Sequence, residues 1–228
     1  MTNLHIAIQM DPIDEVDITG DTSFRLALEA QRREHLVHVY QPEDLSWKEG
    51  VVSAKVQAVT LRDVVGNHVT IGPSKTTPLE MFDVILMRQD PPFDMAYITA
   101  THLLEQLPKT TQVINNPREV RNAPEKLLVT NFLDLMPPTL ISSDLNEIIS
   151  FRAKYKDIII KPLYGNGGAG VFRLQPNDQN LNSLLEMFSG ISREPLMIQA
   201  YLPAVQNGDK RIMIVAVSYT HLTLPTKA

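Results

Sequence analysis

A cluster of glycines behind a lysine is the part of this chain whose residue types most clearly suggest chemistry. The segment Lys161–Arg173 reads KPLYGNGGAGVFR and holds four glycines within six positions, at Gly165, Gly167, Gly168 and Gly170. Glycine accepts positive φ and lets backbone amides approach an anion without a β-carbon in the way. The lysine before the loop adds a mobile positive charge. The segment is therefore a candidate flap over the phosphates of a nucleotide.

Two well-known phosphate and dinucleotide motifs do not fit this loop. It does not end in Gly-Lys-Ser/Thr, so it is not a Walker loop. It also lacks the GxGxxG spacing of a dinucleotide-binding turn, and a strand pattern follows it instead of a helix. Glycine-rich turns also join ordinary strands. From the loop alone, a structural hairpin and a phosphate flap both remain open.

Other segments carry polar groups that could complete a nucleotide site. Lys126 and Lys161 lie on separate predicted elements, and each could contact a phosphate as a point charge. The segment 199–203 ends a strand and enters a turn, and its backbone over 200–202 could read an adenine edge. The segment GDKR, residues 208–211, opens a later strand. Each also has an ordinary explanation, because most lysines are solvated surface residues and GDKR is a common turn signal.

The elements of the first half predict a parallel sheet. Strands are expected over residues 4–10 and 36–40, separated by a helix over 23–33 that is capped by Asp21, Thr22 or Ser23. A hairpin through Gly66-Asn67 is expected between residues 51 and 71. The apolar run 82–87 fits a buried strand, and the polar residues 88–94 follow it, where open α/β sheets bind ligands. A helix over 97–107 and a short strand at 113–114 complete this half.

A boundary near residues 116–123 begins the second half. Helices are expected over 124–135, with Pro124 in its first turn, over 143–155, with Ser142 or Ser143 as cap, and around 181–188. Strands are expected over 139–141, on both sides of the glycine loop between 157 and 174, and over 196–200 and 209–217. The whole is an α/β (α+β) chain.

Composition limits the class of protein. The chain has 228 residues, 43% of them hydrophobic, a net charge of −5 and no cysteine. A core can therefore form, while disulfides and thiolate chemistry are excluded. The acidic balance argues against nucleic acid as the main partner. We expect no membrane span and no secretory signal, and hence a cytoplasmic protein.

Taken as a set, the motifs resemble bacterial glutathione synthetase, an ATP-grasp carboxylate–amine ligase. The resemblance runs from about residue 4 to about residue 215. It rests on MDPI, DTSFRLALEAQRR, VILMRQDPPFD, INNPREVRNAPEKL, IIIKPLYGNGGAGVFR and QAYLPAVQNGDKRIMIV. VILMRQDPPFD and KPLYGNGGAGVFR followed by GDKR are specific to this family, whereas a generic ATP-grasp protein shares only the lysines and a glycine loop.

The resemblance implies an N-terminal parallel-sheet domain over 1–120 and an incomplete ATP-grasp domain over 121–217. It implies ATP-dependent joining of γ-glutamylcysteine to glycine through an acyl phosphate, with magnesium, or manganese in its place, as the metal. Arg211 would steady the oxyanion, and Asp11, Ser23, Arg88 and Asp90 would line the dipeptide side. The residues implied for ATP are Lys126, Lys161, Gly165, Asn166, Gly167, Gly168, Gly170, Gln199, Tyr201, Leu202 and Asp209.

The last residues depart from this resemblance. SYTHLTLPTKA, residues 218–228, continues no pattern of the family, so we expect a C-terminal truncation followed by an unrelated tail. The metal ligands would lie in the missing part, and we expect the 228-residue chain to lack ligase activity. The resemblance also suggests a homo-oligomer, and truncation leaves that assembly in doubt. The alternatives are an ATP-binding fragment without turnover and another ATP-grasp ligase; a Rossmann-type oxidoreductase is disfavoured by the absent GxGxxG.

Overall fold

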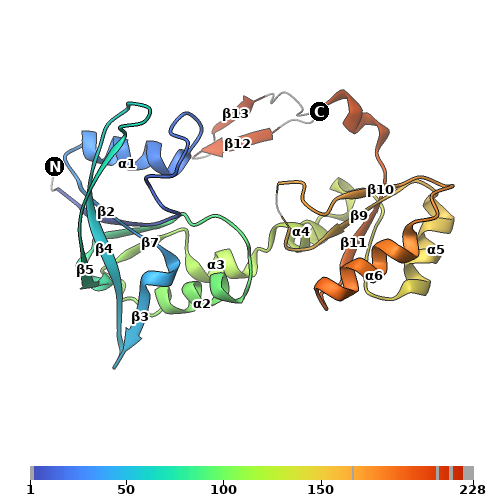
Figure 1. Ribbon diagram of the computed structural model, residues 1–228, viewed down its shortest axis with the longest axis horizontal. Helices are drawn as coiled ribbons and strands as arrows, with labels where there is room; N and C mark the ends of the chain where they lie inside the picture. Colours follow the sequence, from blue (N-terminus) through green and yellow to red (C-terminus); the bar gives the residue numbers. More distant parts are fainter. Residues whose placement is uncertain (1–2, 166, 209–210, 216–217, 223–228) are drawn as a thin grey trace. The chain divides into compact units, whose positions relative to one another are not determined.

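The computed structural model describes residues 3–165, 167–208, 211–215 and 218–222. Its contacts divide the chain into two compact units, Met1–Leu128 with Tyr164–Asn166, and Val129–Leu163 with Gly167–Ala228. Figure 1 shows the elements of each unit along the chain. Within the described ranges, no helix is both long and apolar enough to cross a membrane.

A mixed sheet of seven strands forms the frame of the first unit. Neighbouring strands run in the order β3-β4-β2-β1-β6-β7, and β5 also pairs with β4. The centre, from β2 to β7, is parallel as expected, whereas β3, β4 and β5 pair antiparallel. The strands are β1 (His5–Gln9), β2 (Leu36–Tyr40), β3 (Leu45–Lys48), β4 (Val51–Leu61), β5 (Val69–Pro78), β6 (Val84–Met87) and β7 (Gln112–Ile114).

Two strands of this unit differ from the sequence expectation. β3 was not predicted, and β5 continues to Pro78 instead of ending at Ile71. The second half of β5 reads GPSKTTP, a polar run that contains glycine and proline and therefore lacks the alternation that marks a strand. This segment is a strand because it pairs with the long strand β4, although its local sequence does not predict one.

Helices cover both faces of the central strand β1. Ile6 and Ile8 pack in one cluster with Phe24 of α1, while Ala7 belongs to a second cluster with Leu104 of α2. Side chains alternate along a strand, so burial of consecutive residues requires cover on both sides. The helices of this unit are α1 (Thr22–Arg32), α2 (Met95–Leu104), α3 (Pro117–Asn122) and α4 (Glu125–Leu128).

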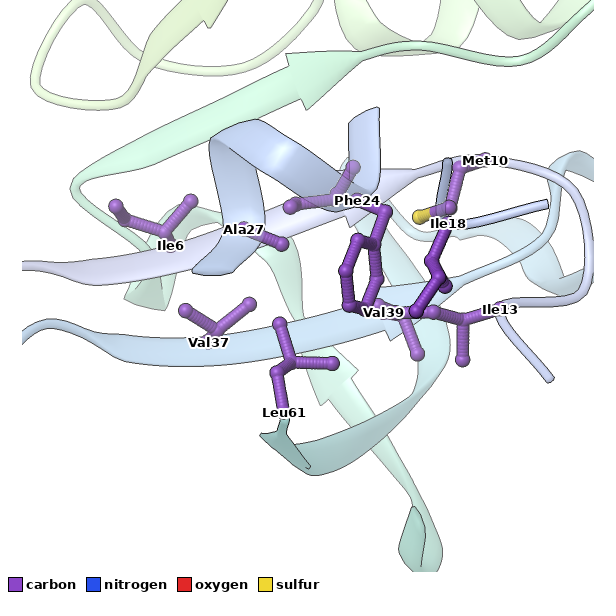
Figure 2. Close-up of a cluster of buried hydrophobic side chains, with 10 residues drawn as sticks. Ile6, Met10, Ile13, Ile18, Phe24, Ala27, Val37, Val39 and Leu61 are labelled. Atoms are coloured by element: carbon purple, nitrogen blue, oxygen red, sulfur yellow. The ribbon is translucent and has the colours of Figure 1, made fainter. Parts of the chain in front are cut away.

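The start of α1 is set by Asp21, one of the three predicted caps. The backbone N–H of Phe24 donates to Asp21 Oδ1 at 2.6 Å, which satisfies one of the amide groups that a helix N-terminus leaves open. Phe24 is fully buried and lies among Met10, Ile18 and Val39 in the cluster drawn in Figure 2. The cap therefore directs the helix so that Phe24 enters the core.

The expected helix over 124–135 is wrong beyond its first turn. α4 ends at Leu128, and two 3₁₀ turns follow, Val129–Asn131 and Leu133–Leu135. Val129 and Thr130 are β-branched, and Thr130 and Asn131 can bond the backbone with their own side chains. Such a run interrupts an α-helix although its apolar residues are spaced as in a helix.

The second unit holds a four-stranded antiparallel sheet covered on one face by two helices. Its order is β10-β9-β11-β8, and Ile158, Ile160 and Ile198 pack against α5 and α6. A separate two-stranded sheet joins β12 to β13. The bounds are β8 (Thr139–Ser142), α5 (Leu145–Tyr155), β9 (Ile158–Pro162), β10 (Phe172–Leu174), α6 (Leu181–Ile191), β11 (Leu196–Ala200), β12 (Arg211–Val215) and β13 (Ser218–Leu222).

The cap of α5 is Asp144, not Ser142 or Ser143 as expected. Asp144 Oδ1 accepts from the backbone N–H of Asn146 at 2.7 Å and of Glu147 at 3.3 Å. Ser142 is still part of β8, and its hydroxyl accepts from the N–H of Asp144 at 2.9 Å. The helix therefore begins later than the first cap-forming residue in the sequence.

Replacing Phe24 by alanine tests the core of the first unit. Phe24→Ala leaves a cavity beneath α1, and we expect the free energy of unfolding to fall by about 3–5 kcal/mol. Leu26→Ala on the same helix is the control, because Leu26 is 49% exposed, and its effect should stay within about 0.5 kcal/mol. Urea denaturation followed by circular dichroism measures both. Equal losses in the two variants would contradict the assigned core.

Candidate functional site

A polar pocket lies in the first unit where two parallel strands end. β1 and β6 pair in register, with Gln9 opposite Met87, so their carboxyl ends meet at one edge of the sheet. The pocket there has a volume of about 290 Å³. It is lined by Met10, Asp11, Pro12, Glu15, Val16, Asp17, Asp21, Ser23, Arg88 and Asp90. All four residues predicted for the substrate side, Asp11, Ser23, Arg88 and Asp90, therefore line one pocket; their role stays a prediction.

Hydrogen bonds from neighbouring elements hold Arg88 in this pocket. Its Nε donates to Ser23 Oγ at 3.1 Å and its Nη2 donates to Thr22 Oγ1 at 2.7 Å, both at the start of α1. Its backbone N–H donates to the carbonyl of Gln9 at 2.7 Å. A planar guanidinium oriented by two hydrogen bonds is suited to binding a carboxylate in a defined orientation. Thr22 was missed as a site residue, although it adjoins Ser23 in the DTS segment.

Asp11 and Asp90 add negative charge to the pocket that holds this guanidinium. The pKa of Asp11 is raised above its ordinary value, first because partial burial penalises the carboxylate and second because Asp90 repels it. The backbone N–H of Asp90 opposes this shift by hydrogen bonding to Asp11. The pocket therefore offers one cationic and several anionic groups, which suits a zwitterionic ligand.

A buried amide pair beneath the pocket was also missed by sequence reasoning. Gln9 Nε2 donates to Gln89 Oε1, and the two residues are 0% and 8% exposed. They are the last residue of β1 and the second residue after β6. The pair ties together the two chain segments that carry Asp11, Arg88 and Asp90. A buried glutamine in an apolar strand is the only local signal that could have pointed to it.

In the second unit, one face of the sheet carries the predicted nucleotide-binding side chains. Ile158, Ile160 and Ile198 point toward the helices, so the alternate residues Ile159, Lys161 and Gln199 belong to the opposite face. In register, Lys161 pairs with Met197 and Gln199 pairs with Ile159, which makes Lys161 and Gln199 near neighbours. Gln199 Nε2 donates to Thr139 Oγ1 at 2.9 Å, which fixes its amide.

The glycine loop connects β9 to β10 and needs its glycines. Gly167, Gly168 and Gly170 have φ values of +58°, +80° and +70°, which L side chains rarely adopt. A β-carbon on Gly170 would also lie 3.1 Å from Cδ of Pro162. The strands on either side are antiparallel, so the loop is a hairpin connection. The two readings that the sequence left open, hairpin and phosphate flap, are therefore compatible in geometry.

The first residues of this loop are grouped with the first unit. Tyr164 stacks on Phe93, with ring centroids 6.1 Å apart and planes 27° apart. Lys126 of α4 donates through Nζ to the carbonyl of Gly165. The predicted residues Lys126 and Gly165 therefore contact each other. Phe93 was not predicted as a site residue; its position in the QDPPFD segment after β6 was the available signal.

The remaining predicted residues are less fully described. Tyr201 and Leu202 follow β11, and Leu202 is 52% exposed. Asn166 and Asp209 lie outside the described residues, as does the side chain of Arg211 at the start of β12. Among the described residues, no group of three or more His, Cys, Asp or Glu side chains could hold a metal ion.

Family models match both parts of the chain. Residues 4–121 match the prokaryotic glutathione synthetase N-terminal domain, and residues 125–225 match the prokaryotic glutathione synthetase ATP-grasp domain. The glutathione synthetase of Brucella melitensis is 56% identical over 212 residues, which cover 93% of this chain and 68% of that protein. The chain thus spans about two thirds of that relative's length.

Solved structures share the fold at low sequence identity. A RimK domain ATP-grasp protein from Sphaerobacter thermophilus has a TM-score of 0.57 at 18% identity, covering 87% of this chain and 64% of its own. D-alanyl-alanine synthetase A from Vibrio cholerae has a TM-score of 0.53 at 14% identity, covering 99% and 70% respectively. These likenesses concern the fold alone, and they agree with the predicted α/β class.

The repulsion between Asp11 and Asp90 gives a testable pH dependence. Asp90→Asn should lower the pKa of Asp11 without restoring its ordinary value, because burial remains the larger cause. Carbon-detected NMR titration of the Asp11 carboxyl group measures this shift. Asp14→Asn, at an exposed carboxylate in the same loop, is the matched control and should leave the Asp11 pKa nearly unchanged.

The sign of the linked stability change follows from the raised pKa. Folded Asp11 holds its proton more strongly than unfolded Asp11, so stability falls as pH rises from the ordinary pKa through the raised one. Asp90→Asn should reduce this loss. An unchanged Asp11 pKa in Asp90→Asn would show that the two carboxylates do not interact.

Proposed function

Because the chain belongs to the prokaryotic glutathione synthetase family, we propose that it binds ATP and γ-glutamylcysteine for the ligation that forms glutathione. The observation that carries this proposal is the β9–β10 glycine loop. Three of its glycines have positive φ, and Lys161 precedes it on the sheet face that also bears Gln199. Its small residues would let backbone amides approach phosphate oxygens closely.

The nucleotide would be held by groups of different kinds along its length. Lys126 and Lys161 would contact the phosphates, and the loop residues Gly165, Asn166, Gly167, Gly168 and Gly170 would cover them. Gln199, Tyr201 and Leu202 would line the adenine and ribose end, with Asp209 nearby. Phosphoryl transfer depends on positioning and charge neutralisation more than on a side-chain nucleophile, which suits this set of residues.

The dipeptide would occupy the pocket at the ends of β1 and β6. γ-Glutamylcysteine carries an α-carboxylate and an ammonium group. Arg88, held by Thr22 and Ser23, would bind the carboxylate. Asp11 and Asp90 would accept hydrogen bonds from the ammonium group. The raised pKa of Asp11 is consistent with a site whose negative charge awaits a cationic partner.

The reaction we propose has two steps. A carboxylate oxygen of the dipeptide bonds to the γ-phosphorus of ATP, whose bond to the bridging oxygen breaks, giving an acyl phosphate and ADP. The amine of glycine then bonds to the acyl carbon, phosphate leaves and the amine loses its extra proton. Arg211 would bind the carboxylate and steady the oxyanion that forms.

Magnesium, or manganese in its place, would supply charge neutralisation on the phosphates. The described residues offer no cluster of metal ligands, so we assign none of them to the metal. We further propose a cytoplasmic protein whose partners are these small molecules, with no nucleic acid or membrane partner.

A second candidate function is ATP binding without turnover. Incubation with ATP, magnesium, glycine and a panel of carboxylate substrates separates the candidates. Glutathione formed from γ-glutamylcysteine supports the ligase. ATP binding without any product supports the second function, and product from other substrates alone supports a different ATP-grasp ligase.

Replacing Lys161 tests the nucleotide site directly. Lys161→Met removes a charge-assisted contact to phosphate, and we expect ADP binding to weaken about 10- to 100-fold in isothermal titration calorimetry. Lys154→Met is the control, because Lys154 is exposed on α5, the helix that packs on the opposite face of the sheet. Equal ADP affinity in both variants would exclude Lys161 from the site.

A further inference from the structure

Arg173 lies on the same sheet face as the predicted nucleotide-binding residues and has no role in the proposal above. It is the central residue of β10 and pairs in register with Ile159 of β9, which in turn pairs with Gln199 of β11. Its neighbours Phe172 and Leu174 belong to the alternate positions, and Leu174 is buried toward α5 and α6. Arg173 and Gln199 therefore share one row across the sheet.

The guanidinium of Arg173 makes two kinds of contact. Its Nε and Nη2 donate to Asp157 Oδ1 at 3.1 Å and Oδ2 at 2.7 Å, a bidentate ion pair. Its central carbon lies 3.6 Å from the ring centroid of Tyr201, so the plane covers the ring face. The backbone N–H of Tyr201 donates to the carbonyl of Asp157 at 2.9 Å. Tyr201 is thus held through both its ring and its backbone.

An ordinary surface ion pair would not have these properties. Exposed pairs between flexible side chains contribute little because they lose conformational entropy. Here the two side chains are 35% and 29% exposed, and the planar fork of arginine meets both carboxylate oxygens. Lysine could keep the charge at this position but could not form both the fork and the flat stack. The arrangement therefore uses properties that arginine alone provides.

We propose that Arg173 and Asp157 form a clamp that positions Tyr201 at the nucleobase end of the nucleotide site. The inference rests on the proposed ATP-binding function. Arg173 is a positioning residue in this scheme, because it acts through Tyr201 and touches no substrate. Arg173 would affect the binding of adenine, because the backbone at 200–202 would form hydrogen bonds with the edge of that base.

The clamp matters because the chain leaves the sheet directly before Tyr201. Ala200 is the last residue of β11, and its N–H donates to the carbonyl of Pro138 at 3.0 Å. Beyond it, the Asp157 carbonyl and the Arg173 stack hold Tyr201, and Leu202 is largely exposed. A segment held in its binding conformation before the ligand arrives loses less entropy on binding.

The preference for ADP over GDP tests the clamp specifically, because a general loss of stability would weaken the binding of both nucleotides alike. Arg173→Met should weaken ADP binding about two- to fivefold, with a smaller effect on GDP, so that the preference for ADP falls. Arg173→Lys keeps the charge near Asp157 and should lie between Arg173→Met and the unaltered chain. Arg193→Met, at an exposed arginine of the same unit, is the matched control and should change neither affinity. Calorimetry with ADP and GDP measures all four proteins.

Hydrogen exchange adds a measurement that needs no nucleotide. Arg173→Met should speed exchange of the Tyr201 amide, whose N–H is bonded to Asp157, relative to the amides of β9. If Arg173→Met impairs folding, Arg173→Lys is a smaller change that can still be compared with the unaltered chain by calorimetry and by hydrogen exchange.

The outcomes separate this inference from the function on which it rests. Absence of ADP binding to the unaltered chain would overturn both. ADP binding that is equal in the unaltered chain, Arg173→Met and Arg173→Lys would overturn the clamp alone. Equal weakening of ADP and GDP would also overturn it, because the effect would then not concern the nucleobase.

Discussion

Side chains alternate between the two faces of a strand, and both units of this protein depend on that constraint. In the second unit, Ile158 and Ile160 must face α5 and α6 to build a core, so Lys161 is left on the opposite face. The same alternation places Arg173 and Gln199 in one row across three strands. Burial of the isoleucines therefore determines where the polar chemistry can occur.

The first unit applies a related constraint through parallel pairing. Strands β1 and β6 run side by side in the same direction, so the residues that follow them meet at one edge. The buried Gln9–Gln89 pair and the bond from Arg88 N–H to the Gln9 carbonyl join these ends. Asp11 can then form a single pocket with Arg88 and Asp90 although it is far from them along the chain. Mutual repulsion of the two carboxylates is a consequence of this proximity.

Both candidate sites contain groups that are held in place by the protein itself. Arg88 is held by two hydroxyl groups of α1, and Tyr201 is held by Arg173 and Asp157. The glycine loop differs from these fixed groups. Gly167, Gly168 and Gly170 have positive φ, and because they carry no β-carbon their backbone amides stay open to approach. Within the second unit, a fixed Tyr201 and a loop of small residues are the two kinds of element expected of a site that orients a ligand and then covers it.

The sequence by itself determined the family, the α/β class and most strand positions, because glycine spacing, apolar runs and specific motifs are local properties. For the same reason it proposed residues for both candidate sites, and their roles stay predictions. It failed where local preference and tertiary context disagreed. Val129 and Thr130 end a helix that apolar spacing favoured, and β5 extends through polar residues because β4 pairs with it. Only the tertiary structure revealed Thr22 beside Arg88, the buried Gln9–Gln89 pair and the stack of Arg173 on Tyr201. These contacts join residues distant in the chain, and their partners are chosen by strand register and packing, which no single segment encodes.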